Sequence, residues 1–251
     1  MSSKASSTPA KPALPSFFTL LKNSCHLLTK NYKLAIGYTS WLLLPIALHI
    51  IIRVTLGHSN LGGLLDLVDN VALAFVAINI FNVITLHVPI WQTKFANQSE
   101  LLVASTTAET AAWRNILPVF LANLLAGFVC LVGSILVIPG LIFITWFAFV
   151  KQIVLFEHTR GTAALIASRN LVRDRVWGVT WRLWAFIILF FALYLIIGGL
   201  ILFAFGFNPS QPFDTMTPPL AADALISLLE IAIFPLIIVY FTLLYQSLKV
   251  E

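Results

Sequence analysis

The sequence predicts an all-α membrane protein: a bundle of about six transmembrane helices with amphipathic helices beside it. Three observations support this fold class. Of the 251 residues, 59% are hydrophobic and only 10% are charged, whereas soluble domains carry roughly 25% charged residues. Six apolar runs have about the length that crosses the hydrocarbon core of a bilayer. Most of the 15 Lys and Arg residues lie in short segments between those runs.

The first half of the chain is predicted to hold one amphipathic helix and two spans. In residues 16–32, apolar side chains recur at helical spacing with lysines on the other side, which predicts a helix lying in the headgroup plane. A helix packed under the bundle is the alternative. Span 1 is expected at 34–56, kinked by Pro45, and span 2 at 71–91. The polar segment 92–115 contains a helix of small residues.

The second half is predicted to hold four spans and another amphipathic stretch. Spans 3 and 4, at 116–138 and 141–156, are expected to be antiparallel neighbours joined by a tight turn at Pro139 and Gly140. Residues 161–177 repeat the amphipathic pattern. The last two spans are expected at 183–207 and 222–247.

The positive charges predict the orientation of the chain. Lysines and arginines precede span 1, follow span 6 and fill the segments after spans 2 and 4, whereas the opposite side has only Arg53 at a span end. The positive-inside rule therefore places both termini in the cytoplasm. Residues 1–15, rich in Ser, Ala, Pro and Lys, are expected to form a disordered cytoplasmic tail, and 16–251 a single transmembrane domain.

A threefold internal repeat is a further prediction. Each unit would consist of an interfacial helix followed by a two-span hairpin, at about 16–91, 99–156 and 161–247. The first and third units match locally, with Ser24 aligned to Ser168. Because every unit would enter the membrane from the cytoplasm, the repeat predicts pseudo-symmetry about the membrane normal, unlike the inverted repeats of many transporters.

Residues 138–177 carry a recognisable pattern: a Pro-Gly pair, an apolar span ending near an acidic residue, and a Gly-Ala-Ser-Leu-basic-Trp stretch. Its residues are Pro139, Gly140, Glu157, Gly161, Ala164, Ser168, Leu171, Arg173 and Trp177. This segment resembles the glycerophosphoryl diester phosphodiesterase membrane-domain family and related bacterial integral membrane proteins, although Asp174 stands where that family usually has Gly. The resemblance implies a bacterial plasma membrane. The phosphodiesterase activity is not carried over, because a barrel of roughly 250 residues has no room beside the spans.

Ionisable and amide side chains inside the spans are candidates for a polar path, because such groups are costly in lipid. Lys151 and Glu230 would carry a transport or gating role. The structural alternative is that Lys151 reaches the interface and that a neighbouring helix satisfies Glu230. Glu157 is expected to pair with Arg160 or Arg173. The full set of intramembrane candidates is Lys151, Glu230, Asn79, Asn82, Asn123 and Gln152.

The leading functional hypothesis is a non-enzymatic membrane module that engages anionic lipids or partner proteins through basic amphipathic helices. The lipid-headgroup candidates are Lys22, Lys30, Lys33, Arg169, Arg173 and Arg175. The alternative is a small transporter or channel that uses Lys151 and Glu230. No nucleophile motif or phosphate-binding loop occurs, so we expect no enzyme activity, cofactor or metal. The basic residues do not cluster as nucleic-acid binding requires. A homo- or hetero-oligomer remains open.

Overall fold

The computed structural model describes residues 13–56, 62–95, 97–134, 137–206 and 220–249. Nearly all of these residues are helical, and none of them forms a strand, so an all-α helical bundle is confirmed. The elements are α1 Phe17–Lys30, α2 Tyr32–Thr39, the 3₁₀ turn η1 Ser40–Leu42, α3 Leu43–Leu56, α4 Gly62–Gln92, α5 Gln98–Arg114, α6 Ile116–Gly133, α7 Val137–Phe147, α8 Val150–Glu157, α9 Thr162–Arg173, α10 Val176–Ala204 and α11 Leu220–Lys249.

Five segments in the described part of the chain are helical, long and apolar enough to cross a membrane. They correspond to predicted spans 2 to 6 and are Asn70–Gln92, Ile116–Gly133, Gly140–Glu157, Val176–Ala204 and Ala224–Lys249. These helices make the chain a membrane protein by length and composition. The first predicted span corresponds to a shorter apolar helical stretch, Tyr32–Leu48, so a sixth span remains a prediction.

Predicted span 1 changes its helical geometry just before its proline. The helix tightens into the 3₁₀ turn Ser40–Leu42, and α3 begins at Leu43. Pro45 lacks the N–H that would donate to the carbonyl four residues earlier, which is Trp41 in that turn. The predicted kink at Pro45 remains a prediction.

The predicted hairpin of spans 3 and 4 is present, but its turn was misplaced. Helix α7 already begins at Val137, so Pro139 and Gly140 lie in its first turn and do not form the turn themselves. The two helices approach closely because glycines face the contact. A Cβ added to Gly133 would meet the Phe143 ring, and one added to Gly140 would lie 2.9 Å from Ser134 Cα.

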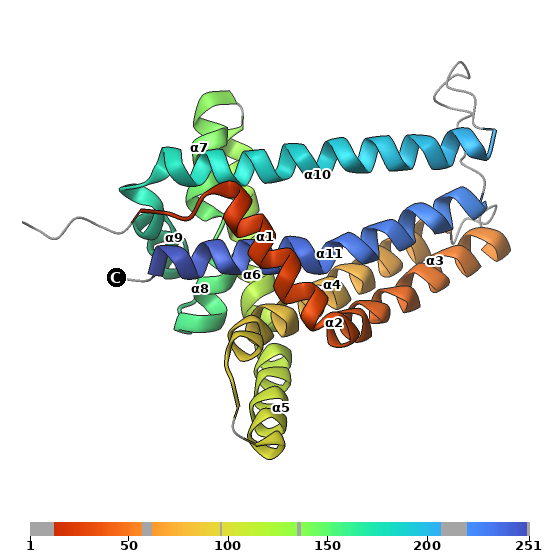
Figure 1. Cartoon of the computed structure of the whole chain (residues 1–251). Coiled ribbons are helices and arrows are strands. Elements are labelled where there is room, and N and C mark those ends of the chain that lie inside the picture. Colours follow the sequence, from red (N-terminus) through yellow and green to blue (C-terminus); the bar gives the residue numbers. More distant parts are fainter. Residues whose placement is uncertain (1–12, 57–61, 96, 135–136, 207–219, 250–251) are drawn as a thin grey trace, which may run out of the picture.

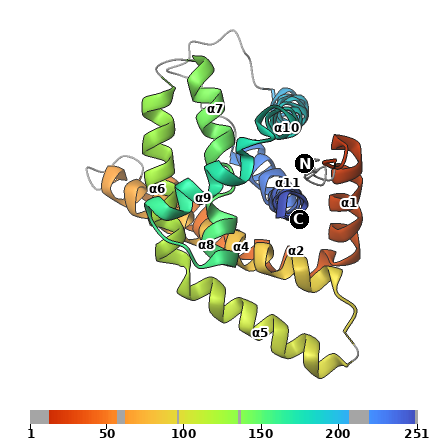
Figure 2. The same cartoon turned by 90° about the vertical axis from the view of Figure 1, so that its left-hand side faces the viewer.

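The helices do not all run in one direction. Helices α3, α10 and α11 run broadly along one axis, α4 runs obliquely to it, and the α6–α7 hairpin crosses the direction of α10 and α11 (Figures 1 and 2). The threefold repeat and its pseudo-symmetry about the membrane normal remain predictions.

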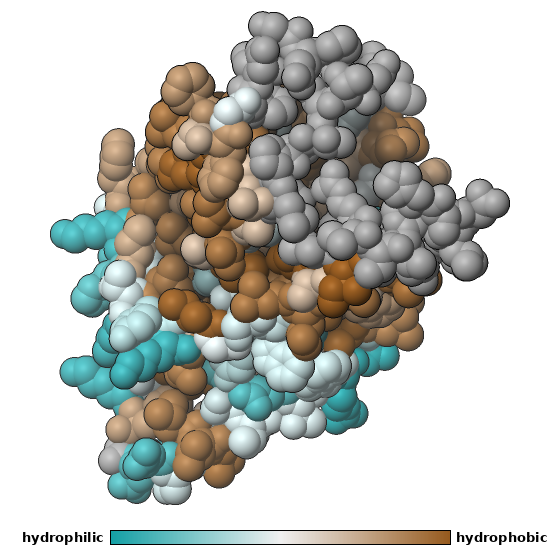
Figure 3. Space-filling view, turned by 90° about the vertical axis from the view of Figure 1, so that its right-hand side faces the viewer, coloured by the Kyte–Doolittle hydropathy of each residue, from teal (hydrophilic) through white to brown (hydrophobic). Residues whose placement is uncertain are grey.

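Two buried apolar clusters form the core. The larger surrounds α8, where Ile153 is buried, and includes Phe186 of α10 stacked on Tyr240 of α11 with ring centroids 4.0 Å apart. The smaller joins Ile84 of α4 to Ile238 of α11. Outside the core, broad surfaces are apolar, and hydrophilic side chains gather toward one side and the lower end in Figure 3. Lipid is the solvent that tolerates such surfaces.

Helix α1 packs across α11 (Figure 1). Leu20 and Ser24 are buried, and the Ser24 hydroxyl donates to Leu20 O at 2.8 Å. The chain just before α1 is held by Arg182 of α10, whose Nε donates to Pro15 O at 2.7 Å and whose Nη2 donates to Leu14 O at 3.1 Å. Helix α1 is thus anchored to the bundle, and its place in the headgroup plane remains a prediction.

Candidate functional site

Four side chains from three helices form a polar cluster beside α4. Tyr38 Oη donates to Glu109 Oε1 at 2.6 Å and lies 3.2 Å from His87 Nε2, which is 2.9 Å from Ser105 Oγ. His87 Nδ1 lies 2.7 Å from Val83 O. A carbonyl can only accept, so the imidazole carries its proton at Nδ1. With a neutral ring, Nε2 accepts from the Ser105 hydroxyl, and each donor of the cluster then has an acceptor.

The cluster exists because α5 packs closely against α4. Ala108 and Ala112 are buried on α5, and small side chains let two helices approach closely. The Asn82 side chain of α4 is fully buried, and its Nδ2 donates to Ala112 O at 3.2 Å. This packing places Glu109, one residue after Ala108, against Tyr38 of α2.

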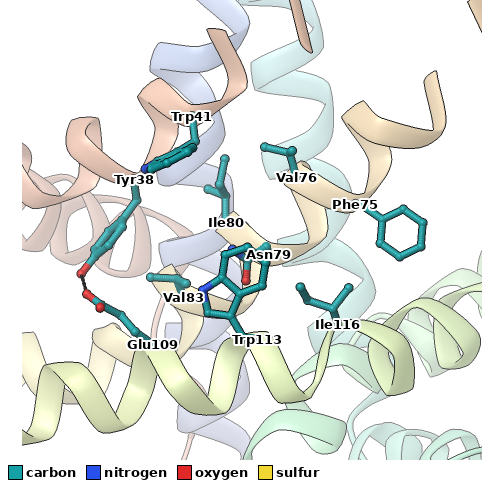
Figure 4. Close-up of a pocket in the computed structure, with 10 residues that line it drawn as sticks. All are labelled: Tyr38, Trp41, Phe75, Val76, Asn79, Ile80, Val83, Glu109, Trp113 and Ile116. Carbon is teal, nitrogen blue, oxygen red and sulfur yellow. Dashed lines mark hydrogen bonds between the residues drawn. The ribbon is translucent and has the colours of Figure 1, made fainter. Parts of the chain in front are cut away.

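A pocket of about 360 Å³ opens next to Glu109 (Figure 4). Its walls come from α2 and η1 on one side, α4 at the base, and α5 with the start of α6 on the other side. The lining residues are Tyr38, Trp41, Phe75, Val76, Asn79, Ile80, Val83, Glu109, Trp113 and Ile116. Its volume lies within the range of about 300–1,000 Å³ that is common for small-molecule sites.

The chemistry of this pocket is aromatic and acidic. Among the described lining residues none is cationic, and Glu109 supplies the one negative charge. Asn79 Oδ1 is buried and finds no hydrogen-bond partner within the described part of the chain. Trp41 and Trp113 are 62% and 66% exposed, so both indoles stand at the rim. The pocket therefore presents aromatic side chains and one carboxylate to a ligand.

The sequence singled out Asn79 but missed Tyr38, Glu109 and Trp113. Their contacts are non-local: Tyr38 and Glu109 lie 71 positions apart. One local signal was available. Glu109 and Trp113 are four residues apart, so they share one face of α5, and the stretch 104–112 around Glu109 otherwise holds only Ala, Ser and Thr.

The structure does not assemble the predicted polar path. Lys151 Nζ lies 4.5 Å from the centroid of the Phe81 ring, a cation–π contact with α4. Glu230 is exposed and accepts a 2.8 Å hydrogen bond from Tyr194 Oη. Gln152 is buried in the core beside Lys151, and Asn123 lines an open, mostly apolar groove along α6. Lys151 and Glu230 thus contact different partners on different helices.

The residues of the Pro-Gly to Trp pattern have structural contacts. Gly161 has φ 59° and ψ −137°, a backbone conformation that suits glycine. The Ser168 hydroxyl is buried and donates to Trp146 O at 2.6 Å, which joins α9 to α7. Trp177 is 78% exposed at the start of α10. These residues fix the connection between α8 and α10.

Glu157 pairs with the end of α11, not with the predicted arginines. Its Oε1 lies 2.9 Å from Lys249 Nζ and accepts a 2.8 Å hydrogen bond from Tyr245 Oη. The prediction assumed a local partner, Arg160 or Arg173, because these follow Glu157 in sequence. The return of α11 past α8 brings a cation from the far end of the chain instead.

The six predicted lipid-headgroup residues fall into two groups. Lys22, Lys30 and Lys33 are exposed along α1 and the start of α2, and Arg169 and Arg173 are exposed on α9, with Arg175 half-buried after it. The Arg169 guanidinium lies 4.6 Å from the centroid of the Trp146 ring. Next to the arginines, Trp177 and Trp181 stand one turn apart, 78% and 69% exposed.

Fold and site together define an all-α helical membrane protein, with an aromatic pocket and a basic, Trp-flanked helix junction. No protein-family model, curated protein or solved structure matches the chain. The resemblance to the glycerophosphoryl diester phosphodiesterase membrane-domain family therefore remains a prediction.

Proposed function

We propose that this protein is a non-enzymatic membrane module that engages anionic lipid headgroups at the cytoplasmic face of a bacterial plasma membrane. Both chain termini would lie on that face. One observation carries the proposal: Trp177 and Trp181 are exposed directly after Arg173 and Arg175. Tryptophan favours the headgroup level of a bilayer, and arginine attracts lipid phosphates.

The course of α10 supports this assignment. After Trp181 the helix continues to Ala204, and Arg182 is the one charged residue in that stretch. Arg182 turns inward and ties down Leu14 and Pro15. The exposed indoles therefore mark where α10 leaves the basic segment and enters an apolar environment, and the start of α1 is held at the same level.

The transporter alternative has less support. Lys151 packs on an aromatic ring and Glu230 bonds a tyrosine, and the pockets described above are lined by other residues. A transport role would need these two groups to share a hydrated route. The lipid-engaging role needs only the exposed basic and aromatic side chains that the α9–α10 junction provides.

The test is lipid enrichment around the purified full-length protein. The protein would be reconstituted in vesicles of equal parts phosphatidylcholine and phosphatidylglycerol. A membrane-solubilising polymer would then extract it together with the lipids that surround it, and mass spectrometry would quantify those lipids. We expect phosphatidylglycerol enrichment that falls as salt rises. The double variant Lys22→Glu/Arg173→Glu should lose the enrichment, since both side chains are exposed.

The matched control is Lys94→Glu/Arg114→Glu, which changes the net charge equally at exposed positions outside the six candidates. It should retain most of the enrichment. The proposal is wrong if the wild type shows no preference for the anionic lipid, or if control and test variants lose it equally.

A further inference from the structure

We propose that the pocket between α2, α4 and α5 binds an organic ammonium group carried on an apolar chain. This site is separate from the basic α9–α10 junction, and the inference does not depend on the lipid-engaging role. It is argued from the charge of the pocket, its aromatic walls and its opening.

The charge of the pocket selects a cation. Glu109 is half-buried, and no ion pair to it occurs among the described residues. Tyr38 occupies Oε1 with its single hydroxyl proton, which leaves Oε2 for a second donor. His87 directs Nδ1 to Val83 O and Nε2 to Ser105 and Tyr38, and no hydrogen bond joins its ring to Glu109 among the described residues. A carboxylate withdrawn from water favours a cationic partner.

The aromatic walls select an organic ammonium over a metal ion. Tyr38, Trp41, Phe75 and Trp113 all line the pocket, and their ring faces attract ammonium groups, especially methylated ones. Asn79 lines the base of the pocket, and its Oδ1 is itself buried. Figure 4 shows Glu109 next to Tyr38 at one side of the pocket and Asn79 near its centre, where the Trp113 ring overlaps it in this view. A divalent metal would instead require several oxygen ligands.

The opening and the volume indicate an amphiphile. Exposed indoles at positions 41 and 113 form the rim, and Trp side chains favour the membrane interface. A volume of about 360 Å³ holds a headgroup and the first part of a chain rather than a whole lipid. The rest of the chain would extend past the rim into the bilayer. The ammonium could belong to a membrane lipid or to a free amphiphilic amine.

The experiment measures binding of radiolabelled decyltrimethylammonium to the full-length protein in a neutral detergent by equilibrium dialysis. Decyl sulfate, with the same chain and opposite charge, is the ligand control. We expect saturable binding of the cation and at least tenfold weaker binding of the sulfate. Equal affinity for the two amphiphiles would overturn the proposal, because the pocket would then be merely apolar.

Glu109→Gln keeps the shape of the side chain and an acceptor for Tyr38, and removes the charge. It should weaken cation binding about tenfold, while Glu100→Gln, an exposed carboxylate on the same helix, should change nothing. Trp113→Leu should weaken binding about five- to tenfold through the lost ring. Unchanged affinity in Glu109→Gln would contradict the inference.

Gly133→Ala separates ligand binding from a general loss of stability. An added Cβ would meet the Phe143 ring at the α6–α7 contact, and neither residue lines the pocket, so cation affinity should stay within about twofold of wild type. Loss of binding equal to that of Glu109→Gln would show that the effect of Glu109→Gln comes from lost stability, and would overturn the proposal.

Two competition experiments with lipids distinguish the source of the ammonium group. The dialysis is repeated with phosphatidylethanolamine or phosphatidylglycerol added to the detergent. Competition by phosphatidylethanolamine alone identifies a lipid headgroup as the ligand, and competition by neither identifies a free amine. Competition by phosphatidylglycerol alone would contradict a cation site.

Discussion

The hydroxyl of Tyr38 donates a 2.6 Å hydrogen bond to Glu109 Oε1 and so joins α2 to α5 across the edge of α4. The other ties between α5 and α4 are the buried alanine face, the Asn82 side chain and the Ser105–His87 hydrogen bond. A single phenol thus positions the carboxylate that gives the pocket its charge.

Tyr38→Phe should therefore destabilise the protein by about 1.5–3 kcal/mol, which is the usual contribution of a hydrogen bond to a charged group. The readout is the free energy of unfolding in mixed detergent micelles. Tyr32→Phe, exposed on the same helix, is the matched control and should be neutral. A neutral Tyr38→Phe would mean that another donor replaces the phenol.

Gly133→Ala should destabilise the α6–α7 hairpin by about 1–3 kcal/mol, because an added Cβ would overlap the Phe143 ring. Gly127→Ala on the same helix has open space and should be neutral or slightly stabilising, since alanine is the better helix former. Unfolding free energies of the two variants provide the comparison. If Phe143→Leu does not relieve the cost at Gly133, the Phe143 ring is not what the added methyl group meets.

Gly161→Ala should cost about 1–3 kcal/mol through backbone strain alone, because nothing lies near the added methyl group and φ is 59°. Gly198→Ala, equally free of neighbours within α10, is the control. The melting temperatures of the two variants, measured by thermal unfolding in detergent, provide the comparison. Equal melting temperatures would show that the chain between α8 and α9 adopts another conformation.

Removing Lys249 should have a small effect, because the pair with Glu157 is partly exposed and such pairs contribute about 0.2–1 kcal/mol. A double-mutant cycle of Glu157→Gln and Lys249→Gln measures their coupling directly. The same cycle with Arg173→Gln should give no coupling. Coupling to Arg173 but not to Lys249 would restore the local pairing that the sequence suggests.

Hydropathy and charge predict much of the fold because they are properties of local runs. The helices at 116–133, 176–204 and 220–249 agree with the expected spans to within a few residues, except that α10 begins earlier, at Val176. The local signal failed at Pro139, which was taken as part of a turn between helices. Pro139 lies in the first turn of α7, a position that tolerates proline.

The site was harder to predict because its groups come from distant parts of the chain. Asn79 was identified from its cost in a membrane, which is a local argument. Glu109 and Tyr38 have ordinary local surroundings, and their partnership depends on how α5 folds back on α4. The same holds for Lys249, which reaches Glu157 only through the course of α11.

The most direct test of the central claim is the membrane depth of the α9–α10 junction. Cys25 and Cys130 would be replaced by serine, and single nitroxide labels placed at Trp177 and Ile188 of the full-length protein in lipid nanodiscs. The account predicts, by power-saturation electron paramagnetic resonance, a label at headgroup level for position 177 and one inside the hydrocarbon for position 188. A label at 177 in bulk water or at the bilayer centre would contradict it.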